Sequence, residues 1–202
     1  MGRPAKPIDE DRLSRLLDVA AEEFLARGYE QASLNRILER SGVAKSSFYH
    51  YFGDKAGLLE TLARSAGEGF DELLRPPEPG GRFPGMDAVL RDTSDRLAAL
   101  ARDRPRAVTL GHLIALPDLP EVPAVRSFRA AVGSRVLRLL LVWRRRGEIS
   151  AVLPLRLQLA ALLAVVQVAD RWVLDRNAAP DAAAQAEELI AQFLRGPNAG
   201  DS

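Results

Sequence analysis

The 202-residue sequence contains no cysteine and only two histidines, His50 and His112. A chain without cysteine cannot form disulfides, thiolate zinc sites or a cysteine nucleophile, and this lack is consistent with a cytoplasmic location. We find no nucleotide-binding glycine loop, no HExxH helix and no GxSxG turn. A carboxylate pair could come from the 27 acidic residues, but nothing singles one out. The sequence therefore does not support an enzyme, and it predicts neither a metal nor a cofactor.

The sequence also has no long apolar run and almost no net charge. The longest uncharged apolar stretch, residues 157–169, is 13 residues long and includes two glutamines. A membrane-spanning helix needs about 20 residues, so we expect a buried helix and no membrane partner. The formal net charge is +1. Any surface that attracts nucleic acid must therefore be local.

Apolar residues recur at helical spacing along most of the chain, and glycine and proline clusters separate the periodic segments. We predict an all-α protein with about nine helices. The first helix follows Asp9 and ends at Gly28, and the fourth begins after Asp54. Gly67 and Gly69 interrupt the fourth helix, which indicates either close helix packing or a bend.

Residues 33–52 predict two short helices joined by a tight turn at Gly42, with Val43 filling the corner. The two apolar faces are Leu34, Ile37 and Leu38, and then Phe48, Tyr51 and Phe52. The side chains predicted to point outward from the second helix are Lys45, Ser46, Ser47, Tyr49 and His50. These groups can hydrogen-bond phosphates or base edges. The pattern is typical of a helix-turn-helix whose second helix lies in a DNA major groove.

An ordered set of residues between Asp9 and Leu62 resembles the DNA-binding domain of the tetracycline-repressor (TetR) family. The set comprises Phe24, Arg27-Gly28-Tyr29, Ser33, Ile37, Ser41-Gly42-Val43, Lys45, Phe48-Tyr49-His50-Tyr51-Phe52, Lys55 and Leu58-Leu59. The chain departs from the family at Ala44, where a serine or threonine usually caps the recognition helix. We expect the missing cap to cost about 0.5–2 kcal/mol of local stability.

The resemblance implies a ligand-responsive repressor that binds a palindromic operator as a homodimer and is released by a small, largely apolar effector. It also implies a domain order: a flexible basic arm (1–8), a helix-turn-helix domain (9–55, with its last helix extending to about 69), a ligand-binding and dimerisation domain (56–195) and a disordered tail (196–202). The family's C-terminal domains diverge, so no particular effector can be inferred.

We predict three kinds of DNA contact. The side chains expected to hold phosphates are Ser33, Lys45, Tyr49 and Lys55. Those expected at base edges are Ser46, Ser47 and His50, with Asn35 and Arg36 reaching in from the preceding helix. Arg3 and Lys6 are expected to follow the minor groove, as basic arms do in other helix-turn-helix proteins.

The helix predicted for residues 154–177 is apolar nearly all round, so more than one side of it must be covered. The resemblance implies that the last two helices form the dimer interface, for which we select Leu162, Val166, Val173, Leu189, Ile190 and Phe193. The candidate effector contacts are His112, Phe128, Val166, Gln167 and Asp170. The polar members of this set could equally have ordinary structural roles, as a hydrogen-bonded core histidine or as polar groups at the dimer interface.

Two features of the sequence allow more than one interpretation. Arg144-Arg145-Arg146 is either a second nucleic-acid patch or a set of cations attracted to a helix C-terminus. The whole chain could also be a helical protein-interaction module without DNA binding. The polar outward face predicted for the second motif helix argues against that module, because interaction faces are more apolar.

Overall fold

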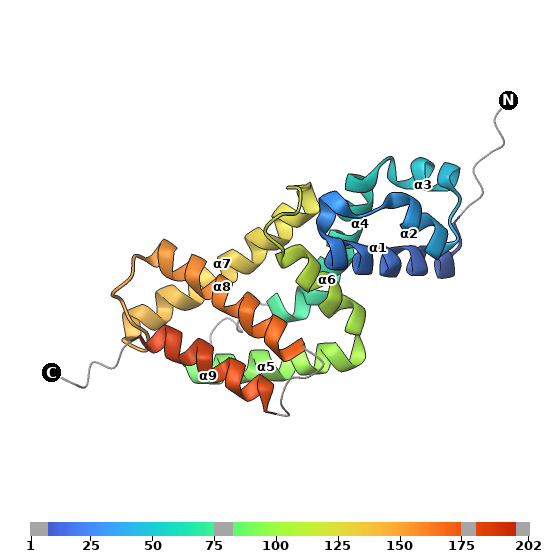
Figure 1. The fold of residues 1–202 in the computed structure, drawn as a ribbon. Coiled ribbons are helices and arrows are strands. Elements are labelled where there is room, and N and C mark those ends of the chain that lie inside the picture. The colour runs from blue at the N-terminus through green and yellow to red at the C-terminus, as the bar shows by residue number, and fades with distance from the viewer. Residues whose placement is uncertain (1–7, 75–82, 175–180, 197–202) are drawn as a thin grey trace. The chain divides into compact units, whose positions relative to one another are not determined.

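The computed structural model describes residues 8–74, 83–174 and 181–196, and every regular element within these ranges is an α-helix (Figure 1). The helices are α1 (Glu10–Gln31), α2 (Leu34–Ser41), α3 (Lys45–Phe52), α4 (Lys55–Leu74), α5 (Met86–Asp103), α6 (Pro105–Ala115), α7 (Pro123–Arg146), α8 (Leu155–Leu174) and α9 (Ala182–Arg195). The predicted all-helical class is confirmed. Arg3, Lys6 and most of the predicted arm and tail lie outside the described residues.

Packing divides the described helices into two compact units. Unit 1 contains α1 to α3, α4 as far as Asp71, α6, and α7 as far as Arg129. Unit 2 contains α5 as far as Arg102, the remainder of α7, and helices α8 and α9. This division follows packing and does not test function, so the predicted boundary between residues 55 and 56 stays a prediction.

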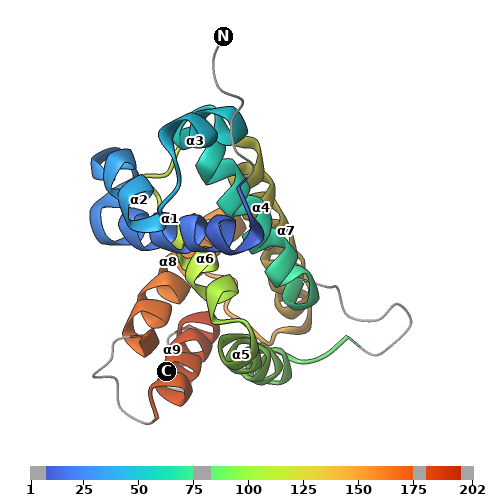
Figure 2. The ribbon, with the colours of Figure 1, turned by 90° about the vertical axis from the view of Figure 1, so that its right-hand side faces the viewer.

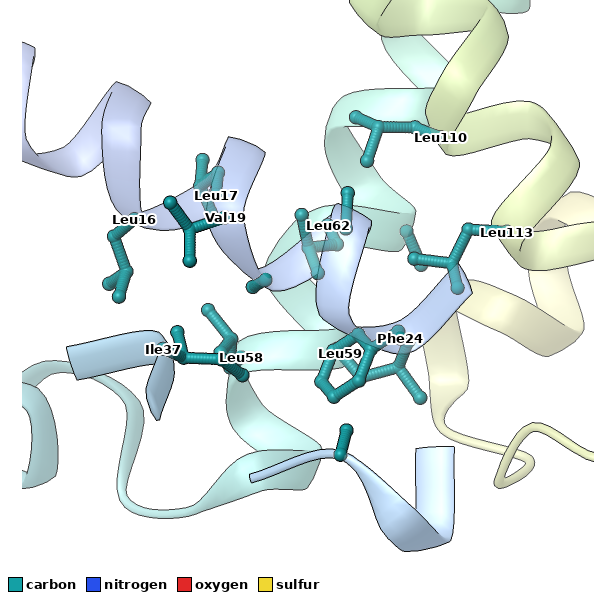
Figure 3. Packing of buried hydrophobic residues seen from close by; sticks show 14 of the residues in the cluster. Leu16, Leu17, Val19, Phe24, Ile37, Leu58, Leu59, Leu62, Leu110 and Leu113 are labelled. Atoms are coloured by element: carbon teal, nitrogen blue, oxygen red, sulfur yellow. The ribbon is translucent and has the colours of Figure 1, made fainter. Parts of the chain in front are cut away.

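Unit 1 has a core to which α1, α2, α3, α4, α6 and the first part of α7 contribute, with side chains that point toward one another (Figure 3). Phe24 of α1, Ile37 of α2, Leu58 of α4 and Leu113 of α6 are completely buried in it. Burying one such side chain stabilises a fold by about 1.5–3 kcal/mol. The helix-turn-helix segment therefore depends on α1, α4 and α6 to cover its apolar side.

Helix α1 begins at a polar cap and bends at a glycine. The Asp9 carboxylate accepts a hydrogen bond from the Arg12 backbone N–H at 2.8 Å, which satisfies one free amide of the first turn. Gly28 has φ 72° and ψ 162°, a conformation that glycine adopts without steric cost. The chain then completes one more turn to Gln31, so the predicted helix end is instead a kink.

Two glycines allow α4 and α6 to approach closely within unit 1. A Cβ atom added at Gly69 of α4 would lie 2.6 Å from the Ala107 Cβ, and one added at Gly111 of α6 would lie 2.5 Å from the Phe70 ring. Both distances are too short for real atoms. A Cβ added at Gly67 would meet nothing within 4 Å. Helix α4 is continuous through both glycines, so close packing explains Gly69 but not Gly67.

Unit 2 has a smaller core, to which α5, α7, α8 and α9 contribute. Its largest buried ring is Trp143 of α7. The Glu148 carboxylate accepts a hydrogen bond from the Met86 N–H at 2.7 Å and so caps the start of α5. Helix α9 runs beside α5 (Figures 1 and 2), where Arg195 forms an ion pair with Asp87.

Candidate nucleic-acid interface

The first helix of the predicted motif, α2, is fixed at both ends. Ser33 is its N-cap, and the Ser33 hydroxyl accepts a hydrogen bond from the Arg36 N–H at 3.4 Å. At the other end, Gly42 takes the left-handed conformation (φ 70°), and its N–H donates to carbonyls of the last turn. Val43 follows and is buried in the core of unit 1. The tight turn is therefore formed as the sequence predicts.

Helix α3 presents Lys45, Ser46, Tyr49 and His50 on its exposed side. The helix is anchored by Phe48, which is completely buried and meets the Tyr49 ring edge-on at a centroid distance of 5.4 Å. The exposed groups offer an ammonium, a hydroxyl, a phenol and an imidazole. Each of these can donate a hydrogen bond to a phosphate or to a base edge.

Two expectations about α3 are wrong. Ser47 is only 4% exposed and therefore belongs to the inner face, so it cannot contact bases from this position. Tyr51, expected in the apolar face, is 51% exposed and meets the His50 ring edge-on at 5.2 Å. The inner face of α3 is thus centred on Ser47 and Phe48, and Tyr51, one turn after them near the end of the helix, is a second exposed phenol.

The recognition helix lacks a side-chain cap. Ala44 occupies the N-cap position with an extended backbone (φ −66°, ψ 140°) and makes no side-chain hydrogen bond. Its carbonyl still accepts the first helical bond, from the Phe48 N–H at 3.0 Å. The expected absence of capping at this departure from the family pattern is confirmed.

Lys55 is directed at the end of α1. Its ammonium donates to the carbonyls of Tyr29 (2.6 Å), Glu30 (3.2 Å) and Ala32 (3.5 Å), and it lies 4.4 Å from the centre of the Tyr29 ring. Burial raises the pKa of the Tyr29 phenol, and the carboxylates of Asp54 and Glu30 raise it further, so this phenol is neutral near pH 7. An ammonium has three donors, so a phosphate contact by Lys55 would require it to release carbonyls.

Arg36 is tied to α1 as well. Its Nη1 donates to Oε1 of Glu23 at 2.8 Å, while the neighbouring Asn35 is exposed. A base contact by Arg36 would have to use the guanidinium donors that this ion pair leaves free. Sequence analysis did not select Glu23, although a signal existed: Glu23 lies three residues after Ala20 and seven after Leu16, on the buried side of α1.

The residues predicted to contact an effector fall in both units. His112 and Phe128 belong to unit 1, whereas Val166, Gln167 and Asp170 belong to unit 2. All five side chains are half-buried. Their role in binding stays a prediction.

The residues predicted to form the dimer interface differ in how much surface they leave for a partner. Leu162 is buried in the core of unit 2, and Val166, Ile190 and Phe193 pack against that core. Only Val173 and Leu189 of the predicted set are exposed. Helix α8 exposes further large apolar side chains that sequence analysis did not select: Leu157, Val168 and Trp172.

The arginines at the end of α7 mainly hold nearby backbone. Arg144 donates to the Ala151 carbonyl and Arg146 to the Phe83 carbonyl, both at 2.7 Å. Arg146 also lies 5.5 Å from the centre of the Phe83 ring. These contacts give Arg144 and Arg146 a local structural role, and the choice between a second nucleic-acid patch and cations attracted to the helix C-terminus stays a prediction.

Two kinds of site are absent from the part of the chain that the structure describes. No helix there combines the length and the apolar character that crossing a membrane requires. The same residues include no group of three or more histidine, aspartate or glutamate side chains placed to hold a metal ion.

Comparisons with known proteins agree with this geometry. The family model for bacterial regulatory proteins of the tetR family matches residues 16–62. A probable HTH-type transcriptional regulator, ArpR of Pseudomonas putida, is 26% identical over 180 residues, covering 86% of each chain. A TetR family transcriptional regulator from Chloroflexus aurantiacus superposes with a TM-score of 0.68 at 25% identity, covering 92% of this chain and 93% of that one. The regulator FadR of Bacillus subtilis, solved with stearoyl-CoA, shares the fold at 18% identity, with a TM-score of 0.63 over 92% of this chain and 100% of that one.

A helix-turn-helix carried by an all-helical chain, with exposed donors on its second helix, defines a DNA-binding transcriptional regulator. Residues 16–62 match the DNA-binding segment of the TetR family model, and the chain is similar over most of its length to TetR-family transcriptional regulators. This family is non-enzymatic.

Proposed function

We propose that this regulator is a homodimeric repressor that binds a palindromic operator and leaves it when a small, largely apolar effector binds. The observation that carries the proposal is the exposed side of α3, where Lys45, Ser46, Tyr49, His50 and Tyr51 stand on a helix anchored by a buried core. Lys45 and the two phenols suit phosphates, and Ser46 and His50 suit base edges. Such a role on DNA implies a cytoplasmic location.

The apolar surface of α8 supports the homodimer. Leu157, Val168 and Trp172 are separated by 11 and 4 residues, which places them along one side of the helix. Helices α8 and α9 pack against each other and expose Val173 and Leu189 in addition. Two such helix pairs can bury this surface as a four-helix bundle. Because Leu162 is already buried, we leave it out of the proposed interface.

The symmetry of the proposed dimer determines the symmetry of the operator. A two-fold arrangement brings two copies of α3 to half-sites about one helical turn apart, so the operator is a palindrome. An effector can shift the protein between forms with different DNA affinity only by binding one form more tightly. We propose that His112, Phe128, Val166, Gln167 and Asp170 include residues that make these differential contacts. The stearoyl-CoA bound to FadR of Bacillus subtilis gives one example of a ligand with a long apolar acyl chain in this fold.

A selection experiment separates the proposed function from an interaction module without DNA binding. The full chain is mixed with a pool of random duplexes, and bound sequences are recovered at two salt concentrations. We expect a palindrome with half-sites about 10 base pairs apart. Recovery of unrelated sequences, or of none, would overturn the proposal.

The contribution of α3 is measured by replacing Lys45 with alanine. We expect weaker binding to every duplex and a flatter dependence of affinity on salt, by about 0.9 in logarithmic slope for each phosphate that Lys45 neutralises. Arg145→Ala is the matched control, because Arg145 is an exposed cation of unit 2. Equal slopes for Lys45→Ala and the wild type would remove Lys45 from the interface.

A further inference from the structure

Glu23 of α1 is a buried carboxylate with three donors gathered around one oxygen. Its side chain is 4% exposed. Oε1 accepts hydrogen bonds from the Ser33 N–H at 3.1 Å and from Arg36 Nη1 at 2.8 Å, and Arg27 Nε lies 3.3 Å away. A buried carboxylate is tolerated only when charges and hydrogen bonds compensate it. Here two guanidiniums and one backbone amide provide that compensation.

Two cations on one anion leave the cluster with a local excess of positive charge. Both nitrogens lie within 3.3 Å of the same oxygen, so Arg27 Nε and Arg36 Nη1 cannot be more than about 6 Å apart. The two arginine side chains are 52% and 42% exposed. Within the described part of the chain, neither guanidinium has a second carboxylate partner. Each guanidinium has five N–H donors, so donors remain for a ligand from solvent.

The pair lies at the start of the helix-turn-helix. Ser33, whose amide is held by Glu23, is the N-cap of α2, and Arg36 is the third residue of that helix. Lys55, one of the side chains predicted to hold phosphates, donates its hydrogen bonds to carbonyls at the end of α1. The two guanidiniums are therefore partly exposed cations beside the helix-turn-helix, whereas the ammonium of Lys55 is already hydrogen-bonded.

We infer that Arg27 and Arg36 bind the DNA phosphate backbone as a pair, with Glu23 as the positioning residue that holds both guanidiniums. The inference rests on the proposed function, since it concerns how the same chain grips DNA. A guanidinium fork matches the oxygens of a phosphate. Guanidiniums that are already held in place lose less conformational entropy on binding. Phosphate binding of this kind fixes the register of the helix-turn-helix on the duplex without reading its sequence.

The test compares salt dependences of DNA binding. The full-length chain and its variants are titrated onto the duplex recovered by selection, with fluorescence anisotropy as the readout, between about 50 and 200 mM salt. Arg27→Gln and Arg36→Gln remove the charge but keep a long polar side chain. We expect each variant to flatten the logarithmic slope by about 0.9 for every phosphate that the arginine neutralises, and the double variant to combine both effects.

Two further variants separate binding from structure. Arg40→Gln is the matched control, because Arg40 also lies on α2 and also pairs with a glutamate of α1, namely Glu22, which is exposed. We expect it to keep the wild-type slope. Arg27→Lys retains the charge and should restore the slope, with weaker affinity because a lysine lacks the fork. Thermal melting checks that every variant is folded.

The outcomes distinguish this inference from the proposed function. A wild-type slope in a folded Arg27→Gln variant would overturn the pair, because Arg27 would then only neutralise Glu23. An equal flattening in Arg40→Gln would overturn it too, since any cation of α2 would then have the same effect. Absence of salt-dependent binding by the wild-type chain would overturn the proposed function, and the inference with it.

Discussion

The two units differ in how completely each buries its own apolar side chains. Among the described residues, the core cluster of unit 1 has 22 buried members and that of unit 2 has nine. The exposed large apolar residues follow the opposite trend. Three belong to unit 1: Leu25, Tyr49 and Tyr51. Eight belong to unit 2: Leu141, Val152, Leu153, Leu157, Val168, Trp172, Val173 and Leu189.

This difference is what we expect if unit 2 associates with a partner through its exposed apolar side chains and unit 1 does not. Two of the three exposed apolar residues of unit 1 are tyrosines on α3, whose hydroxyls can also serve DNA binding. The apolar side chains exposed by unit 2 are mostly aliphatic. Contiguous apolar surface on a protein commonly marks an interface. We therefore expect the stability of unit 2, but not that of unit 1, to depend on association.

The largest expected effect is that of Phe24→Ala. Phe24 is completely buried in unit 1 and packs against the Tyr29 ring at 5.4 Å, so the cavity should cost about 3–5 kcal/mol. Both tryptophans, Trp143 and Trp172, lie in unit 2. In urea unfolding monitored by circular dichroism, we expect the transition of unit 1 to move to a lower urea concentration. The transition monitored by tryptophan fluorescence, which reports on unit 2, should not change. An identical shift in both signals would show that the two units unfold together, which would contradict the proposed difference in their stability.

The next effect concerns association. Val168 is 64% exposed, and Val168→Glu would place two unpaired carboxylates in the proposed dimer interface. We expect the dissociation constant to rise at least about 100-fold, or about 2.7 kcal/mol, in sedimentation equilibrium. Leu25→Glu, at an exposed apolar residue of unit 1, is the matched control and should leave the mass unchanged. A Val168→Glu protein that remains dimeric would exclude this face of α8.

Gly69→Ala tests the close packing inside unit 1. Its Cβ would lie 2.6 Å from the Ala107 Cβ, so we expect overpacking to destabilise unit 1 by about 1–3 kcal/mol. Gly67→Ala, on the same helix in open space, should instead stabilise it by about 1 kcal/mol. Urea unfolding by circular dichroism measures both. Stabilisation by both changes would contradict the packing explanation for Gly69.

The smallest effect is expected from Ala44→Ser, which restores a side-chain cap to α3. The extended backbone at Ala44 suits a cap, so we expect a gain of about 0.5–2 kcal/mol in the free energy of unfolding of unit 1. Ala44→Val adds bulk without an acceptor and should give no gain. If amide exchange in α3 is slower in Ala44→Ser but not in Ala44→Val, the gain in stability comes from capping. Equal exchange rates in the two variants would contradict this explanation.

Much of the fold can be predicted because local signals agree with it. Ser33 and Asp54 cap α2 and α4 as expected, the Gly57 N–H donating to the Asp54 carboxylate at 2.8 Å. Apolar spacing locates the helices, because a helix of several turns repeats the same face often enough to be unambiguous. Helix α3 is only eight residues long. Two turns fix a face only approximately, which is why the pattern does not predict the burial of Ser47 or the exposure of Tyr51.

The partners of charged side chains cannot be predicted in the same way. Lys55 has the sequence position of a phosphate ligand, yet its ammonium bonds carbonyls 23 to 26 residues away. Glu23 and Arg36 are separated by 13 residues and meet only when α1 and α2 pack. Helical spacing places a side chain on a face, but it does not say which donor or acceptor the next helix brings. The same limit applies to the interface residues, because spacing alone does not single out Val168 and Trp172.

The paired glycines of α4 and α6 have a consequence for how unit 1 responds to force. Gly69 receives the methyl group of Ala107, and Gly111, one turn further along α6, receives the ring of Phe70. Each helix therefore contributes one glycine and one side chain that packs against the glycine of the other helix. The two contacts are neighbours along the interface between the helices. Sliding α6 along its axis by one residue would bring a Cβ against a backbone that has no room for it. We therefore expect the axial register of α4 and α6 to be fixed, so that a shift of one helix along its axis is transmitted to the other.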